Sequence, residues 1–231
     1  MAIHNYNDFI KALSEAGFSQ FGGKGDGVVS LIHYGWGCEP TDDSIHWHTG
    51  DPETDPWEWR MRVLNECNDV AYAKMFFRKA GYITKEWYPY FLAARRGTNI
   101  FEEAYADGTM NQISKRIFEI IEDNGNISFH EIKQRGRFSK EDNSRFERAI
   151  VELQMKMFIT MCGSQQKISK SGEEHGWAST MFCTTEHFWG DEVFGKAVNI
   201  TEKDAIEKIT AQIYKLNPNA NEKKIIKFIK G

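Results

Sequence analysis

The stretch that decides the fold runs from Gln112 to Trp189 and reads QISKRIFEIIEDNGNISFHEIKQRGRFSKEDNSRFERAIVELQMKMFITMCGSQQKISKSGEEHGWASTMFCTTEHFW. Its first part has apolar residues at helical spacing with charged residues between them, namely Ile113, Ile117, Ile120 and Ile121. This periodicity predicts an amphipathic helix. Asn124 and Gly125 tolerate the left-handed conformation of a helix end, so the helix is expected to end there.

Three further elements follow in quick succession. Ile127 and Ser128 leave room for a very short strand, and Ser128 can cap a helix that starts at Phe129 and ends at Gly136. Ser139 and Asp142 have the spacing of a capping box. They predict a long third helix whose apolar face carries Phe146, Ile150, Leu153 and Met157.

The stretch ends in a predicted hairpin. Phe158–Cys162 and Ser179–Thr185 are β-prone, and the polar segment Gly163–Gly176 between them is a charged, glycine-bearing loop. Helix, short strand, helix, long helix and hairpin follow one another in the order of a winged helix-turn-helix. The loop of the hairpin is then the wing.

The rest of the chain is predicted to be mainly helical. Helices are expected at Tyr6–Ala16, Trp57–Cys67, Val70–Lys79, around Phe101–Tyr105, at Thr201–Leu216 and around Ile225–Ile229. The predicted fold class is therefore α+β and mainly helical. The expected parts are a helical N-terminal region with a Trp/His-rich loop (1–110), a winged helix (111–190) and C-terminal helices that dock on the body (191–231).

Composition excludes several classes of protein. A hydrophobic fraction of 41% in 231 residues suits a globular core. No apolar run approaches the roughly 18 residues that cross a bilayer, and the N-terminus lacks the pattern of a signal peptide. We therefore expect no membrane partner and a cytoplasmic location.

The four cysteines lie far apart in the sequence and are expected to be reduced. The formal net charge is −4, and only the C-terminal tail is basic.

The segment Ile45–Arg60 reads IHWHTGDPETDPWEWR and is the most unusual of the chain. One interpretation is a zinc or manganese site, with His46, His48 and either Asp51 or Asp55 as ligands. A second is a loop that its tryptophans anchor on the core. A third is a pocket for a flat, polar ligand such as a nucleobase, lined by His46, Trp47, His48, Asp55, Trp57, Trp59 and Arg60. The run Gly22–Gly27 lacks the spacing of a Walker A loop, and no cofactor is expected.

The second and third helices of the winged helix carry most of the candidate DNA contacts. Basic side chains there and in the wing are plausible phosphate ligands, namely Lys133, Arg135, Arg137, Lys140, Arg145, Arg148, Lys167 and Lys170. However, Glu141 with Arg145 and Arg148 with Glu152 also have the spacing of i,i+4 ion pairs. The third helix is therefore either a DNA-contacting helix or a structural helix laced with salt bridges.

Several blocks together resemble the AlkZ-related proteins: WHTGDPETDPWEWR (47–60), AYAKMFFRKAGYITKEWYPYF (71–91), SRFERAIVELQMKMFIT (144–160) and GWASTMF (176–182). These are small relatives of the AlkZ-like DNA glycosylases, a superfamily built from winged-helix modules that releases alkylated bases or unhooks interstrand cross-links. The resemblance implies a winged-helix fold and DNA as a partner, in DNA repair. If the protein is an enzyme, it implies hydrolysis of an N-glycosidic bond.

The catalytic pattern of those glycosylases is incomplete here. It comprises a Gln, an aliphatic or aromatic residue and then a Gln or Asp near the N-terminus. The nearest match is Gln20-Phe21-Gly22, where Gly22 supplies no side chain to hold water. Gln20, Asp55 and Glu58 are the candidate catalytic residues. Three hypotheses follow: a DNA-associated protein without the usual glycosylase motif, an active glycosylase on alkylated bases, or an interaction module or small-ligand binder that does not bind DNA.

Overall fold

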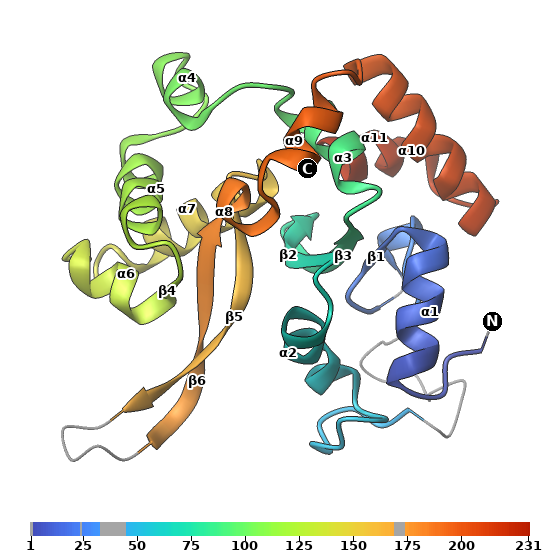
Figure 1. Cartoon of the computed structure of the whole chain (residues 1–231), viewed down its shortest axis with the longest axis horizontal. Coiled ribbons are helices and arrows are strands. Elements are labelled where there is room, and N and C mark those ends of the chain that lie inside the picture. The colour runs from blue at the N-terminus through green and yellow to red at the C-terminus, as the bar shows by residue number, and fades with distance from the viewer. Residues whose placement is uncertain (1, 24, 33–44, 169–173) are drawn as a thin grey trace. The chain divides into compact units, whose positions relative to one another are not determined.

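The computed structural model describes residues 2–23, 25–32, 45–168 and 174–231 (Figure 1). Contacts along the chain divide it into two compact units. Unit 1 comprises Met1–Thr98 with Glu192–Gly231, and unit 2 comprises Asn99–Asp191. Both contain helices and antiparallel strands, so the fold is mixed α and β. None of the helices in the described ranges combines the length and the apolar composition that crossing a bilayer requires.

Unit 1 contains three strands and several helices from both ends of the chain. They are α1 (Tyr6–Ala16), β1 (Phe18–Gln20), the 3-10 turn η1 (Gly25–Gly27), α2 (Pro56–Glu66), β2 (Val70–Phe76), β3 (Lys79–Thr84), α3 (Tyr88–Arg95), α9 (Asp191–Ala197), α10 (Glu202–Leu216) and α11 (Glu222–Lys230). Strand β3 pairs antiparallel with both β1 and β2. The helices predicted at α1, α2, α10 and α11 are confirmed, with their bounds within a few residues, and so is the helix predicted around Phe101–Tyr105 in unit 2.

The end of α1 shows why its boundary could be predicted. Asn5 caps the helix by accepting from the Asp8 amide at 3.0 Å, and Gly17 ends it with a φ of 85°. A Cβ atom at Gly17 would lie 2.1 Å from the Trp87 ring. A larger residue would therefore meet both backbone strain and a clash at this position.

The helix predicted at Val70–Lys79 is wrong, because this segment forms the β2–β3 hairpin. Phe76 pairs with Lys79, so only Phe77 and Arg78 form the turn, and both have positive φ values, 50° and 64°. Such two-residue turns usually contain Asn or Gly, whose absence removes the sequence signal of a hairpin. The N-terminal region is therefore less helical than predicted.

Unit 2 follows the predicted order of helices and strands. Its elements are α4 (Phe101–Ala106), α5 (Gln112–Asn124), β4 (Ile127–Ser128), α6 (Phe129–Arg135), α7 (Asn143–Met155), β5 (Ile159–Ile168), β6 (Glu174–Thr184) and α8 (Thr185–Trp189). Strand β6 pairs antiparallel with β5 on one side and β4 on the other. Figure 1 shows β5 and β6 as a long hairpin. Both strands extend further into the loop than predicted.

One boundary in unit 2 differs from its prediction. Ser139 and Asp142 do bond to each other, since the Ser139 amide and hydroxyl donate to Asp142 Oδ2 at 3.0 and 2.9 Å. Helix α7 nevertheless begins only at Asn143. The two residues therefore form a turn before the helix and not its first turn. The core under α7 contains Phe146, whose ring lies 5.1 Å from Phe129 and 4.7 Å from Phe138.

Candidate functional site

Asp55 connects the Trp/His-rich loop to α2. Its side chain is fully buried and accepts three backbone amides, from Thr49 at 2.8 Å, Gly50 at 3.0 Å and Trp57 at 2.8 Å. A carboxylate at a helix N-terminus satisfies amides that would otherwise have no partner. Asp55 thereby orders the loop that precedes α2 and fixes where α2 begins.

Trp57 and Trp59, two residues apart on α2, point in different directions. The Trp59 side chain is fully buried, stacks on Phe9 at 5.2 Å and donates from Nε1 to the Pro52 carbonyl at 3.1 Å. Trp57 is 36% exposed. Trp59 therefore anchors this segment on the core, as one of the interpretations expected, whereas Trp57 remains at the surface.

Trp57 belongs to a group of rings and one guanidinium that we call the Phe21 cluster: Phe21, Trp47, His48, Trp57 and Arg60. The Phe21 centroid lies 5.3 Å from Trp47 and 6.3 Å from Trp57, and the His48 centroid lies 5.0 Å from Trp57. The Arg60 guanidinium lies 3.3 Å from the centroid of the Trp57 ring, the geometry of a cation–π contact. His48 is exposed and has a φ of 62°.

Two buried tyrosines lie beneath the Phe21 cluster. Tyr72 and Tyr82 face each other across β2 and β3, with centroids 5.0 Å apart, and Phe21 packs against both. Burial raises the pKa of Tyr72, and Arg60, which is hydrogen-bonded to its hydroxyl, opposes that shift. The Tyr82 hydroxyl is buried and has no hydrogen-bond partner among the described residues. A buried hydroxyl without a partner is destabilising unless a ligand or water satisfies it.

The strand register places Gln20 on the face of the unit 1 sheet that is opposite to the Phe21 cluster. Ser19 pairs with Tyr82, whereas Gln20 pairs with Gly81, and successive side chains of a strand point to opposite faces. Gln20 therefore lies on the face of Phe18, whose ring packs on Phe91 of α3. Its side chain is buried, and Nε2 has no hydrogen-bond partner in the described part of the chain. Gln20 and the Phe21 cluster are consequently not brought together.

The remaining candidates of this region lie at the surface. Glu58 is exposed in the first turn of α2, and His46 is exposed. Asp51 accepts from the Glu53 amide at 2.9 Å and the Thr54 hydroxyl at 2.7 Å, and these bonds lower its pKa. Within the described ranges, no three His, Cys, Asp or Glu side chains are grouped so that they could hold a metal ion.

Six of the eight basic residues predicted to contact DNA lie on α6, α7 and the segment between them, and the other two, Lys167 and Lys170, belong to the predicted wing. Two of them have partners in unit 2: Arg145 forms an ion pair with Asp142 at 2.7 Å, and Arg135 donates to Asn124 Oδ1. Lys133 is half-buried, with Nζ 5.9 Å from the centroid of Phe146. Lys170 lies outside the described residues, as does the side chain of Lys167.

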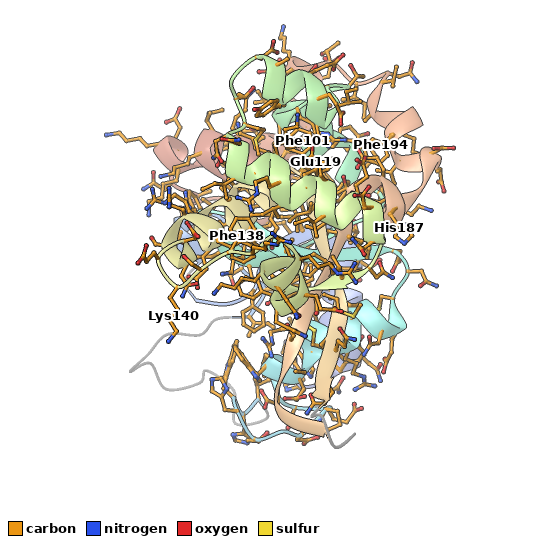
Figure 2. All side chains as sticks on the ribbon, turned by 90° about the vertical axis from the view of Figure 1, so that its left-hand side faces the viewer. Phe101, Glu119, Phe138, Lys140, His187 and Phe194 are labelled. Atoms are coloured by element: carbon orange, nitrogen blue, oxygen red, sulfur yellow. The ribbon has the colours of Figure 1, made fainter. Side chains whose placement is uncertain are left out.

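The other three, Arg137, Lys140 and Arg148, are exposed, and none forms an ion pair with a carboxylate of the described residues. The i,i+4 pairs expected on α7 do not form, because Arg145 bonds to Asp142 and Glu152 accepts from Asn111. Figure 2 shows Lys140 pointing away from unit 2, whereas Phe138 lies against α5, with the Arg116 guanidinium 4.7 Å from its centroid.

Several carboxylates lie near Glu122 of α5. Burial raises the pKa of Glu122, and the nearby carboxylates of Glu102, Asp123, Glu186 and Glu119 add to the shift. Glu119 and His187 mark this side of unit 2 in Figure 2. Carboxylates therefore gather around Glu122, while three cations without ion pairs in the described residues lie on α7 and in the segment before it.

Sequence reasoning selected most of the Phe21 cluster but missed Tyr72 and Tyr82 beneath it. Tyr72 lies in the segment predicted to be a helix, and only the β2–β3 pairing brings its ring against that of Tyr82. No local signal marks them, because the turn that joins the strands lacks the usual residues.

Comparison with known proteins gives one match. A family model described as AlkZ related matches residues 3–230, nearly the whole chain. Neither the curated proteins nor the solved structures contain a match.

Proposed function

The chain belongs to the AlkZ-related family, and from this premise we propose that it is a DNA-associated protein that binds the phosphate backbone through α6, α7 and the segment between them. Family membership suggests a role of the DNA-repair type. The observation that carries the proposal is the presence of three exposed cations, Arg137, Lys140 and Arg148, without ion pairs in the described residues. Cations already held in salt bridges would gain less from a phosphate.

The element order of unit 2 supports the same proposal. A helix, a short strand, two helices and a hairpin, with β4 and β5 on either side of β6, fit a winged helix-turn-helix. In that fold α7 is the helix that approaches the DNA and the β5–β6 loop is the wing. The protein carries a net charge of −4, so a local group of cations and not the overall charge drives this binding.

The test is duplex DNA binding at several salt concentrations. The triple variant Arg137→Ala/Lys140→Ala/Arg148→Ala should lower the affinity on the order of 10-fold or more and reduce the slope of log affinity against log salt by about 3. The control is Lys11→Ala/Lys215→Ala/Lys223→Ala, which removes the same charge from exposed positions of unit 1. Equal losses in both variants, or no binding by the unaltered protein at low salt, would refute the proposal.

We further propose that the usual glycosylase chemistry is absent. Gly22 replaces the second polar residue of the catalytic motif. Gln20 lies on the same face of β1 as Phe18, and the Phe21 cluster lies on the opposite face. The Asp55 carboxylate already accepts hydrogen bonds from three backbone amides. No excised base is expected from duplexes that carry alkylated purines. Base release that Gln20→Ala abolishes would establish the alternative, an active glycosylase.

A second candidate function is the binding of a flat ligand, such as an unstacked nucleobase, at the Phe21 cluster. The specific observation is the pair formed by the exposed Trp57 ring and Arg60, above the partnerless Tyr82 hydroxyl. Base stacking on an aromatic ring contributes about 1–3 kcal/mol per base. Trp57→Ala should weaken binding of single-stranded oligothymidine roughly 5- to 100-fold. Tyr214→Ala, which removes an exposed ring of α10, is the control. Equal affinities of both variants would exclude this site.

A further inference from the structure

Two of the four cysteines lie side by side at the base of the β5–β6 hairpin. Cys183 of β6 pairs with Thr160 of β5, and Cys162 lies two residues beyond Thr160 on β5. The ladder is irregular between Met161 and Gly163, which places Cys162 in a bulge. The two thiols are hydrogen-bonded to each other, and both are free.

The two thiols differ in exposure and in pKa, and these differences determine which of them reacts first with an oxidant. Cys162 is partly exposed, whereas Cys183 is buried. The hydrogen bond from Cys183 lowers the pKa of the Cys162 thiol, while the same bond and burial raise the pKa of Cys183. The thiolate is the nucleophilic form of cysteine, so Cys162 is the first of the two to react with a soluble oxidant.

We propose that Cys162 and Cys183 form a peroxide-sensitive thiol pair that is converted to a reversible disulfide. The Cys162 thiolate attacks hydrogen peroxide, the O–O bond breaks, and Cys162 becomes a sulfenic acid while hydroxide leaves. The Cys183 sulfur then attacks the sulfenic sulfur, the S–O bond breaks, and the hydroxyl leaves with the Cys183 proton as water. In total, two thiols and one peroxide give one disulfide and two waters.

The disulfide would join the two strands close to their connections with the helices. Strand β5 starts at Ile159 after α7, and β6 ends at Thr184 before α8. The Thr185 amide already donates to the Phe158 carbonyl at 3.1 Å there. The two strands are thus already paired on either side of the two thiols before oxidation, at Ile159 with Thr184 and at Gly163 with Met181.

The experiment uses the full chain with Cys38→Ser and Cys67→Ser, which leaves only this pair of the four cysteines. After treatment with hydrogen peroxide, denaturation and thiol titration, we expect both thiols to be lost and to return with dithiothreitol. A non-reduced tryptic digest should contain one cross-linked species that joins the peptides of Cys162 and Cys183.

Two further variants establish the order of the steps. With Cys183→Ser added, Cys162 should accumulate as a sulfenic acid that dimedone traps. With Cys162→Ser added, the remaining Cys183 thiol should persist. Retention of both thiols in the parent protein, sulfinic acid at Cys162 without a cross-link, or disulfides between different molecules would each overturn the proposal.

Discussion

The aromatic core of unit 2 comes from one continuous segment, whereas the aromatic core of unit 1 combines residues that lie far apart in the sequence. In unit 2, Phe101 stacks on Phe118 at 4.2 Å and lies 5.3 Å from Phe158, so one continuous segment supplies the core. In unit 1, Phe228 of the last helix stacks on Phe76 of β2 at 4.1 Å. A core that needs both ends of the chain can form only after a large loop has closed.

Hydrogen bonds of unit 1 show the same dependence on the C-terminal helices. Arg95 of α3 donates to the carbonyls of Phe228 and Ile229, at 3.1 and 2.8 Å. Asn217, which follows α10, donates to the Val28 carbonyl at 2.8 Å. The C-terminal segment is therefore part of the core of unit 1. In unit 2, in contrast, the stacked rings of Phe101, Phe118 and Phe158 all come from one continuous segment, Asn99–Asp191.

The largest expected effect comes from separating these segments. Residues 99–191 alone should unfold cooperatively, since this unit is one continuous segment of the chain. Residues 1–98 alone should not fold, because Phe228 and its neighbours are missing, and adding residues 192–231 as a second chain should restore folding. Circular dichroism during urea unfolding measures both results. Cooperative unfolding of residues 1–98 by themselves would contradict the comparison.

A single ring should reproduce much of that effect. Phe228→Ala removes a fully buried aromatic ring and should destabilise unit 1 by about 3–5 kcal/mol. Ile226→Ala, on the same helix but 51% exposed, should change stability by at most about 0.5 kcal/mol. Hydrogen exchange should show lost protection in β1, β2 and α3 with Phe228→Ala, while α5 keeps its protection. A similar loss with both variants would show that α11 matters for its helicity and not for its core side chain.

The same difference explains which parts of the fold could be predicted from the sequence. The boundaries in unit 2 depend on local signals, such as Gly125 after α5 and Ser128 before α6, which a sequence displays directly. In unit 1 the β2–β3 hairpin turns at Phe77 and Arg78, two residues that rarely occupy positive φ. Tertiary pairing with β1 determines that segment, and no local pattern reports it.

The candidate site follows the same division. Trp57 and Arg60 could be chosen from an unusual local composition, and the structure brings them into contact. Successive residues of a strand point to opposite faces, but which of Gln20 and Phe21 shares the face of Tyr82 depends on the register of β1 with β3. Register is a property of a pair of strands. It cannot be predicted from the sequence when β3 is not recognised as a strand.

A local cap provides a smaller test, confined to unit 2. The Ser128 hydroxyl lies 2.6 Å from Glu131 Oε2 in the capping box of α6. Ser128→Ala should destabilise unit 2 by about 1 kcal/mol. Ser144→Ala, at an exposed position of α7, is the control and should change stability by at most about 0.5 kcal/mol. Urea unfolding of residues 99–191 is the measurement. If both variants behave alike, the cap does not hold α6 in place.

The smallest effect is expected from an ion-pair group at the surface of unit 1. Lys85 and Lys196 donate to Glu192 at 2.6 and 2.8 Å, and hydrogen bonds from Lys196 and Lys85 lower the pKa of Glu192 to about 2. The folded protein therefore binds this proton more weakly than the unfolded chain does. The resulting stability is present above the ordinary glutamate pKa of about 4.3 and is lost as pH falls towards 2.

Glu192→Gln should accordingly lower the melting temperature slightly at pH 7, by less than Ser128→Ala does in unit 2. The difference between Glu192→Gln and the unaltered protein should shrink at pH 3, and salt should reduce it at pH 7, because the three side chains are largely exposed. Glu207→Gln, whose oxygen lies 3.8 Å from Lys203, is a matched exposed control with a longer ion pair. A difference of the same size at pH 3 as at pH 7 would show that Glu192 stabilises unit 1 through its packing and not through its charge.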